Sequence, residues 1–159
     1  MLMYEPELKE IAAHTVAYLP MRGPYAQTPE GYGRLYGWTA QHGLVPEGMP
    51  GAVYLTMPSE VPEADARWEL IAPLADEPAE REPDEDGVGI RHVGPMTVAS
   101  VTHVGPYETV GPAYATLFGW LARSGYRPAG PPMEVYYSDP ATVAPSDYVT
   151  EIRIPIAVA

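Results

Sequence analysis

Cysteine is absent from the 159-residue chain, and basic residues are scarce, with nine Lys and Arg against 21 Asp and Glu. Without cysteine the chain can form no disulfide and no thiolate, and its redox compartment cannot be inferred. The formal net charge of −12 at pH 7 argues against a phosphate backbone or an anionic membrane surface as partner. The composition therefore favours a neutral or cationic ligand.

Long apolar runs and metal-binding patterns are missing too. No segment is long and apolar enough to span a bilayer, and the first nine residues carry acids where a signal peptide would carry basic residues. No serine has the flanking glycines of a nucleophile elbow. The four histidines show no paired metal spacing. We expect a soluble, cytoplasmic protein without metal or cofactor.

The chain does contain an internal repeat with a constant spacing of 82 residues. Thr-Val-Ala at 15–17 recurs at 97–99, Gly-Pro-Tyr at 23–25 recurs at 105–107, and Gly-Trp at 37–38 recurs at 119–120. Because the register never slips, two copies of one unit account for nearly the whole chain. We expect one domain over residues 1–159, with repeat 1 at about 4–75, a linker at 76–87 and repeat 2 at about 88–159.

Each copy is predicted to run strand, helix, strand, strand. Residues 97–101 are β-prone and end at Gly-Pro, and the apolar residues that follow recur at the helical spacing i, i+3, i+4 and i+7. Both helices should stop near Gly43 and Gly125. This helical stripe comprises Tyr114, Leu117, Phe118 and Leu121, and Tyr32, Leu35 and Tyr36 repeat it in the first copy.

Two further strands should complete each copy, at 52–57 and 67–74 in the first and at 133–137 and 148–156 in the second. In the last strand Ile152 and Ile154 face the helix while Glu151 faces away. A further extended stretch should begin each copy, because Leu8 and Ile11 align with Ile90 and Val93. The predicted fold is α+β, with antiparallel sheets, one main helix per copy, pseudo-two-fold symmetry and a ligand cleft between the copies.

The strongest candidates for a site are Glu69 and Glu151, because an acid is disfavoured in the middle of a strand. Tyr54 and Tyr136 lie on the preceding strands, and Glu134 shares the face of Tyr136. A carboxylate ringed by tyrosines can bind a large flat cation. The alternative is a solvent-facing glutamate on an exposed sheet, and alternation alone does not decide between the two.

Trp68 precedes Glu69, whereas Thr150 precedes Glu151 in the second copy. The indole either fills a gap in the core or shields Glu69 from water, which would raise the pKa of the carboxyl and suit it to general acid or base catalysis. Tyr25 and Tyr107 follow Gly-Pro before each helix and should pack where the two copies meet. They complete the predicted ligand-binding set.

Several motifs of the second copy together resemble the GyrI-like effector-binding domain, which occurs alone or behind the DNA-binding part of AraC-type and MerR-type regulators. They are Val98-Ala99, the run from His103 to Tyr107, the run from Leu117 to Leu121, Gly130-Pro131-Pro132, Glu134-Val135-Tyr136 and the run from Thr150 to Ile156. The resemblance covers almost the whole chain. It implies a tandem pair of strand-helix-strand-strand units with small molecules bound between them.

The resemblance also implies that an acid in an aromatic cleft recognises lipophilic cations. By motif this acid is Glu151, with Glu134 and Glu69 as further candidates and Tyr136 and Tyr54 lining the cleft. One branch of the family comprises hydrolases of cyclopropane-bearing toxins, which the chain resembles at Trp68-Glu69. The chain has no helix-turn-helix region, so transcriptional control would need a partner protein.

We therefore expect a stand-alone protein that senses or sequesters aromatic, cationic lipophilic compounds, with no nucleic acid or membrane as direct partner. One alternative is a hydrolase that uses Glu69 on strained cyclopropanes. Another is a protein-interaction module such as a gyrase modulator. Binding should leave its ligand unmodified, an enzyme should turn it over, and a modulator should act on its target without any ligand.

Overall fold

Residues 4–159 are described by the computed structural model and divide into two units of antiparallel sheet, each with one long helix. Unit 1 holds residues 4–12 and 95–159, and unit 2 holds residues 13–94. The predicted α+β class and the single main helix per copy are confirmed. None of the helices in this part of the chain has the length and apolar character needed to cross a membrane.

Unit 2 contains four paired strands in the order β3-β4-β2-β5. Their bounds are β2 (His14–Arg22), β3 (Gly51–Tyr54), β4 (Arg67–Leu74) and β5 (Gly89–Val93). The helix α1 (Thr28–Gln41) has a proline in its first turn and ends just before Gly43, whose φ of 68° favours glycine. Its residue Leu35 is fully buried, as are Leu70 and Trp68 of β4.

Unit 1 repeats this plan, with paired strands in the order β1-β6-β9-β8 and a short extra strand β7 on β9. The bounds are β1 (Glu7–Ile11), β6 (Met96–Val104), β7 (Tyr126–Pro128), β8 (Met133–Tyr136) and β9 (Val149–Val158). The helix α2 (Gly111–Ser124) ends at Gly125, as predicted. Leu117 and Leu121 of α2 form one buried cluster with Ile152 and Ile154 of β9.

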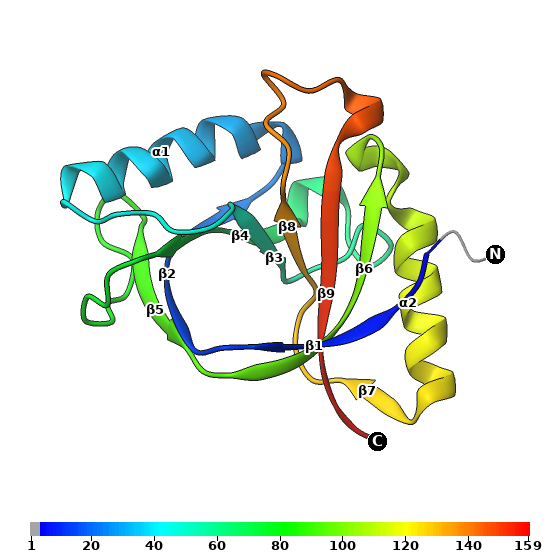
Figure 1. Cartoon of the computed structure of the whole chain (residues 1–159). Helices are drawn as coiled ribbons and strands as arrows, with labels where there is room; N and C mark the ends of the chain where they lie inside the picture. The colour runs from blue at the N-terminus through cyan, green and yellow to red at the C-terminus, as the bar shows by residue number, and fades with distance from the viewer. Residues whose placement is uncertain (1–3) are drawn as a thin grey trace. The chain divides into compact units, whose positions relative to one another are not determined.

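The edge strand of unit 1 comes from the other end of the chain. Figure 1 shows β1, near the N-terminus, beside β6, with Glu7 opposite Ser100 and Ile11 opposite Met96. In unit 2 the same place is taken by β5, which pairs with β2 and lies 82 residues after β1. The predicted opening strand of each copy therefore exists, but β5 completes the sheet of unit 2 rather than that of unit 1.

The predicted linker, residues 76–87, belongs to unit 2 and packs on its helix. The indole Nε1 of Trp38 donates to Asp84 Oδ2 at 3.2 Å, and the Arg81 guanidinium lies 5.4 Å from the centre of the Trp38 ring. Trp38 thus packs against the segment that follows β4. The single domain, its pseudo-two-fold symmetry and the cleft between copies stay predictions.

The structure differs from the sequence-based expectations at one strand and at one helix residue. The strand β7 was not predicted, and Phe118, assigned to the buried stripe of α2, is 39% exposed. Ala113, one turn before Leu117, is buried instead. Helical spacing places a residue near a face but does not fix the edge of the buried stripe, and Phe118 lies at that edge beside the Tyr114 ring.

Candidate ligand-binding site

The two sides of each sheet carry different chemistry. Residues directly opposite each other on antiparallel strands project to the same side. Ile152 points to the helix and pairs with Glu134, whereas Glu151 pairs with Val135. Glu134 therefore lies on the side that faces the helix and Glu151 on the opposite side. The grouping of Glu134, Tyr136 and Glu151 around one ligand was wrong, because it lacked the pairing register of β8 and β9.

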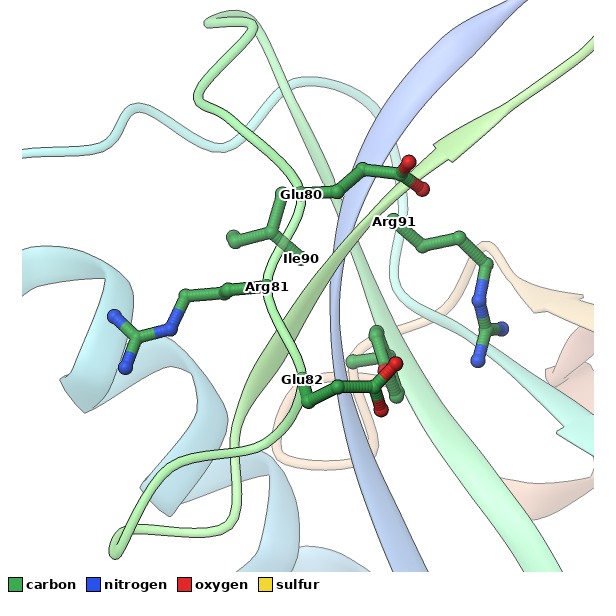
Figure 2. Close-up of a pocket in the computed structure, with 6 residues that line it drawn as sticks. Glu80, Arg81, Glu82, Ile90 and Arg91 are labelled. Atoms are coloured by element: carbon green, nitrogen blue, oxygen red, sulfur yellow. The ribbon is translucent and has the colours of Figure 1, made fainter.

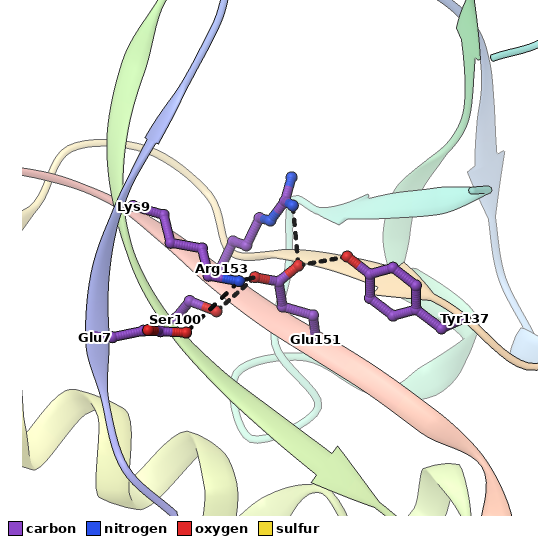
Figure 3. Close-up of polar contacts among 6 residues, drawn as sticks. All are labelled: Glu7, Lys9, Ser100, Tyr137, Glu151 and Arg153. Carbon is purple, nitrogen blue, oxygen red and sulfur yellow. Dashed lines mark hydrogen bonds and ion pairs between the residues drawn. The ribbon is translucent and has the colours of Figure 1, made fainter. Parts of the chain in front are cut away.

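Glu151 is the centre of a buried polar network on the opposite side of unit 1 (Figure 3). Its side chain is 2% exposed and accepts hydrogen bonds from Lys9 at 2.7 Å, Ser100 at 2.7 Å and Tyr137 at 2.8 Å, with the Arg153 guanidinium at 2.9 Å. Two cations and two hydroxyls thus surround one carboxylate. A solvent-facing glutamate is excluded at this position.

This network keeps Glu151 charged. Burial disfavours the ionised form, but the hydrogen bonds from Lys9, Ser100, Arg153 and Tyr137 outweigh it and lower the pKa of Glu151 to about 2. The same contact raises the pKa of Lys9 above its ordinary value. Because its charge is already neutralised by two cations, Glu151 has little free capacity for a cationic ligand.

Glu69 occupies the equivalent position in unit 2 and is also paired. Arg91 binds it through two hydrogen bonds of 2.8 and 3.0 Å, and the guanidinium lies 4.0 Å from the centre of the Tyr18 ring. Gly89 makes room for that ring, since a Cβ there would lie 2.6 Å from Tyr18 Cζ. The hydrogen bond to Glu69 raises the pKa of Arg91.

The arrangement does not support the expected shielding of Glu69 by Trp68. Adjacent strand residues point to opposite sides. The Trp68 indole lies beside Tyr25 with ring centres 4.7 Å apart and a 44° tilt between the rings, while Glu69 contacts Arg91. The indole therefore fills the core under α1. Hydrolysis at Glu69 stays a prediction.

A surface hollow of about 380 Å³ lies beside the Glu69–Arg91 pair, and none of the predicted site residues lines it. Figure 2 shows Glu80 and Glu82 projecting on the side of Arg91, while Arg81 points the other way. No group of three or more His, Asp or Glu side chains within residues 4–159 is placed to hold a metal.

Glu134 differs from both strand glutamates. It is 7% exposed, and its two oxygens accept hydrogen bonds from the hydroxyls of Tyr114 on α2 and Tyr136 on β8, the latter at 2.9 Å. Within residues 4–159 it forms no salt bridge with Lys or Arg. Burial raises the pKa of Glu134, and the two tyrosine hydrogen bonds offset only part of this rise.

Aromatic rings gather on the same side as Glu134. Tyr107 lies 5.5 Å from Tyr136 in an edge-on contact and stacks on Tyr148 at 4.8 Å between ring centres. Burial raises the pKa of Tyr107, and the charges of Tyr148 and Glu134 add to the rise. We call Tyr107, Tyr114, Tyr136 and Tyr148 the tyrosine cluster. It brings together two of the predicted ligand-binding tyrosines and one predicted acid.

The predicted aromatic residues of unit 2 also meet on its helix-facing side. The Tyr25 ring lies 4.7 Å from Trp68 and 6.4 Å from Tyr54, and Tyr54 pairs directly with Trp68 across the strands. We call Tyr25, Tyr54 and Trp68 the aromatic trio. Glu69 projects to the other side and takes no part in it.

Sequence reasoning missed His103, which is buried and pairs with Thr150 across the strands. Its Nδ1 lies 2.8 Å from the Tyr4 hydroxyl and its Nε2 lies 2.9 Å from Thr109 Oγ1. Nε2 also lies 3.2 Å from Pro106 O, so both ring nitrogens of His103 have polar partners. The signal was present, because His103 aligns with the apolar Met21 of the first copy.

Sequence reasoning also missed the cations that pair with the strand glutamates. Lys9 and Arg91 are 82 residues apart, as are their partners Glu151 and Glu69. The chain has only nine basic residues, and two of them, Lys9 and Arg91, lie at the repeat spacing. This coincidence indicates that both copies form the same kind of ion pair.

Comparison with known proteins assigns the family. The GyrI-like small molecule binding domain matches residues 4–157. The chain belongs to this family. A DNA gyrase inhibitor of Edwardsiella piscicida is 32% identical over 155 residues, which cover 94% of this chain and 96% of that protein. The GyrI-like resemblance inferred from the sequence is therefore confirmed.

Several solved structures share the fold. The EcmrR C-terminal domain has a TM-score of 0.79 at 22% identity and covers 99% of this chain and 100% of that one. EcmrR in a DNA complex has a TM-score of 0.86 at 20% identity, and the chain spans 59% of its length. SAV2435 bound to tetraphenylphosphonium has a TM-score of 0.56 at 14% identity over 96% of this chain and 94% of that one.

Proposed function

We propose that this GyrI-like domain binds lipophilic aromatic cations, to sense or sequester them, and that Glu134 is the carboxylate that recognises the positive charge. The observation that carries the proposal is a buried acid held by two tyrosine hydroxyls and free of Lys or Arg within residues 4–159. Sequence analysis favoured Glu151 for this role. The structure supports moving it to Glu134.

The proposal depends on which of the three buried glutamates is not already paired with a Lys or Arg of the described residues and can therefore bind a cationic ligand. Glu151 and Glu69 already pair with cations of the chain, whereas Glu134 is surrounded by rings whose faces attract positive charge. The two hydroxyls orient the carboxylate and leave each of its oxygens able to accept a further contact. The fold neighbour SAV2435 was solved with tetraphenylphosphonium, a lipophilic aromatic cation.

The test compares tetraphenylphosphonium with tetraphenylborate, which has the same shape and the opposite charge. Calorimetry should show preference for the cation, and Glu134→Gln should reduce this preference about tenfold, which corresponds to about 1.4 kcal/mol. Glu85→Gln is the matched control, because it removes the same charge from an exposed position in residues 76–87. Equal loss in both variants would show that overall charge, not Glu134, attracts the cation.

Inhibition of DNA gyrase is a second candidate function. It is favoured by the relative from Edwardsiella piscicida, which bears that name and aligns over 94% of this chain. A supercoiling assay with purified gyrase should then show inhibition by the protein without any added ligand. Unchanged supercoiling at a large molar excess of the protein would rule this candidate out.

A further inference from the structure

The Trp68 indole carries a hydrogen-bond donor that nothing in the described chain accepts. Trp68 is 1% exposed, and its Nε1 is one of only three buried side-chain nitrogen or oxygen atoms without a partner in residues 4–159. A buried donor left unpaired is costly, because it loses water and gains no acceptor. Such an atom calls for an explanation in terms of a group that binds there.

The second copy repeats the observation with a different side chain. Thr150 aligns with Trp68, is fully buried, and its Oγ1 also lacks a partner. Each of the two residues pairs across the strands with a tyrosine at the equivalent position, Tyr54 or Tyr136. An accident of packing would not be expected to recur with an indole in one copy and a hydroxyl in the other. In each copy this strand position therefore holds a buried polar atom that can still form a hydrogen bond with a ligand.

The surroundings of Trp68 determine which ligand it could take. Tyr25 and Tyr54 supply ring faces, while the position of Glu134 is occupied in unit 2 by Ala52, which is buried. Glu69 projects to the other side of the sheet, toward Arg91. The aromatic trio thus combines ring faces with the unpartnered indole donor of Trp68 and carries no charged side chain.

We propose that the aromatic trio is a subsite for flat, neutral aromatic compounds that carry a hydrogen-bond acceptor, which receives the Nε1 proton of Trp68. An indole N–H can only donate, so a carbonyl or ring nitrogen fits it and a plain hydrocarbon does not. Tyr25 covers the indole and is itself half-buried, on the short turn Tyr25–Gln27. Tyr25 lies on a turn and not on a strand, so its side chain can move to admit a ligand without breaking the sheet.

This subsite does not depend on the charge recognition proposed for Glu134. A matched pair of probes, fluorenone and fluorene, differs in the carbonyl while keeping the three flat rings. The protein labelled with ¹⁵N-tryptophan should give three indole signals, from Trp38, Trp68 and Trp120. Fluorenone should move the Trp68 signal downfield and fluorene should not. If fluorenone moves none of the three signals downfield, the proposal is overturned.

A variant provides the second arm. Trp68→Phe keeps an aromatic ring and removes the donor, so the ratio of fluorenone to fluorene affinity should fall about tenfold, while Trp120→Phe should leave it unchanged. The carbonyl stretch of bound fluorenone should lie at lower wavenumber in the parent protein than in Trp68→Phe. An unchanged ratio and an unshifted stretch would overturn the proposal. Glu134→Gln should leave the ratio intact even if cation binding is lost or never found.

Discussion

The two units share one scaffold, yet the sides that face their helices differ in polarity. At three equivalent positions unit 2 has Met21, Ala52 and Trp68, all buried. Unit 1 has His103, Glu134 and Thr150 at these positions, also buried. Burying a polar group costs free energy unless the group is hydrogen-bonded, so the concentration of polar residues in the core of one unit points to function rather than to folding.

The sides of the two sheets that face away from the helices differ less, because each carries an ion pair at the same two repeat positions. Lys9 with Glu151 and Arg91 with Glu69 occupy equivalent positions and join each edge strand to the sheet of its unit. They differ in the surrounding support. Glu151 has three further polar partners, whereas Arg91 is the one cation that pairs with Glu69 in the described residues. The repeat thus keeps its ion pair and varies the polarity of the side that faces the helix.

The largest difference between the two ion pairs is expected when Glu151 is replaced. Its pKa of about 2 lies below the ordinary 4.5, so its stabilising effect is complete above pH 4.5 and is lost as the pH falls toward 2. This loss amounts to about 3 kcal/mol in the free energy of unfolding. Glu151→Gln should be less stable at pH 7 and should lose correspondingly less between pH 5 and pH 2. Urea denaturation across this range measures both, with Glu85→Gln as control, and parallel pH curves for parent and Glu151→Gln would contradict the assignment.

The next effect separates the two ion pairs. Arg91→Met leaves Glu69 without its cation, and we expect a loss of about 2 kcal/mol in the free energy of unfolding, reduced from that of a fully buried pair because Arg91 is partly exposed. Lys9→Met leaves Arg153 on Glu151, so about 1 kcal/mol should be lost. Urea denaturation at pH 7 gives both values. Equal losses would show that the two pairs are equivalent. No recovery in the double variant Glu69→Leu with Arg91→Met would show that an unpaired Glu69 charge does not cause the loss.

Much of the fold could be predicted from the sequence because each strand and helix pattern occurs twice, once in each copy. The strand predicted at 67–74 matches β4, and Gly43 and Gly125 follow the ends of α1 and α2 as expected. The placement of β1 was not readable. Alternation in Glu7–Ile11 indicates a strand, but which copy it completes depends on pairing between residues about 90 apart.

The candidate site was predicted in composition but not in arrangement. Tyr107, Tyr136 and Glu134 do lie together, whereas Glu151 lies on the other side of the sheet. Period-two alternation gives the relative side of residues within one strand, but only the register between β8 and β9 relates Glu134 to Glu151. The neighbours of Glu69 in the sequence did not distinguish a free acid from one paired with Arg91, and only the repeat spacing of Lys9 and Arg91 indicated the pair.

The smallest effect compares two equivalent helix tyrosines. Tyr114 donates to Glu134, whereas Tyr32 in unit 2 donates to the carbonyl oxygen of Gly51 at 2.6 Å. A hydrogen bond to the charged form lowers the pKa of an acid, so Tyr114→Phe should raise the pKa of Glu134 further.

A bound cation requires ionised Glu134, so tetraphenylphosphonium affinity should rise as the pH increases through the raised pKa of this acid. In Tyr114→Phe the midpoint of this rise should move to higher pH, while Tyr32→Phe should leave it in place and affect only stability. Calorimetric titrations between pH 4 and pH 8 measure the midpoints. If both variants shift it equally, or neither does, then Glu134 is not the acid that recognises the cation, and the difference between the two units would reflect packing rather than charge recognition.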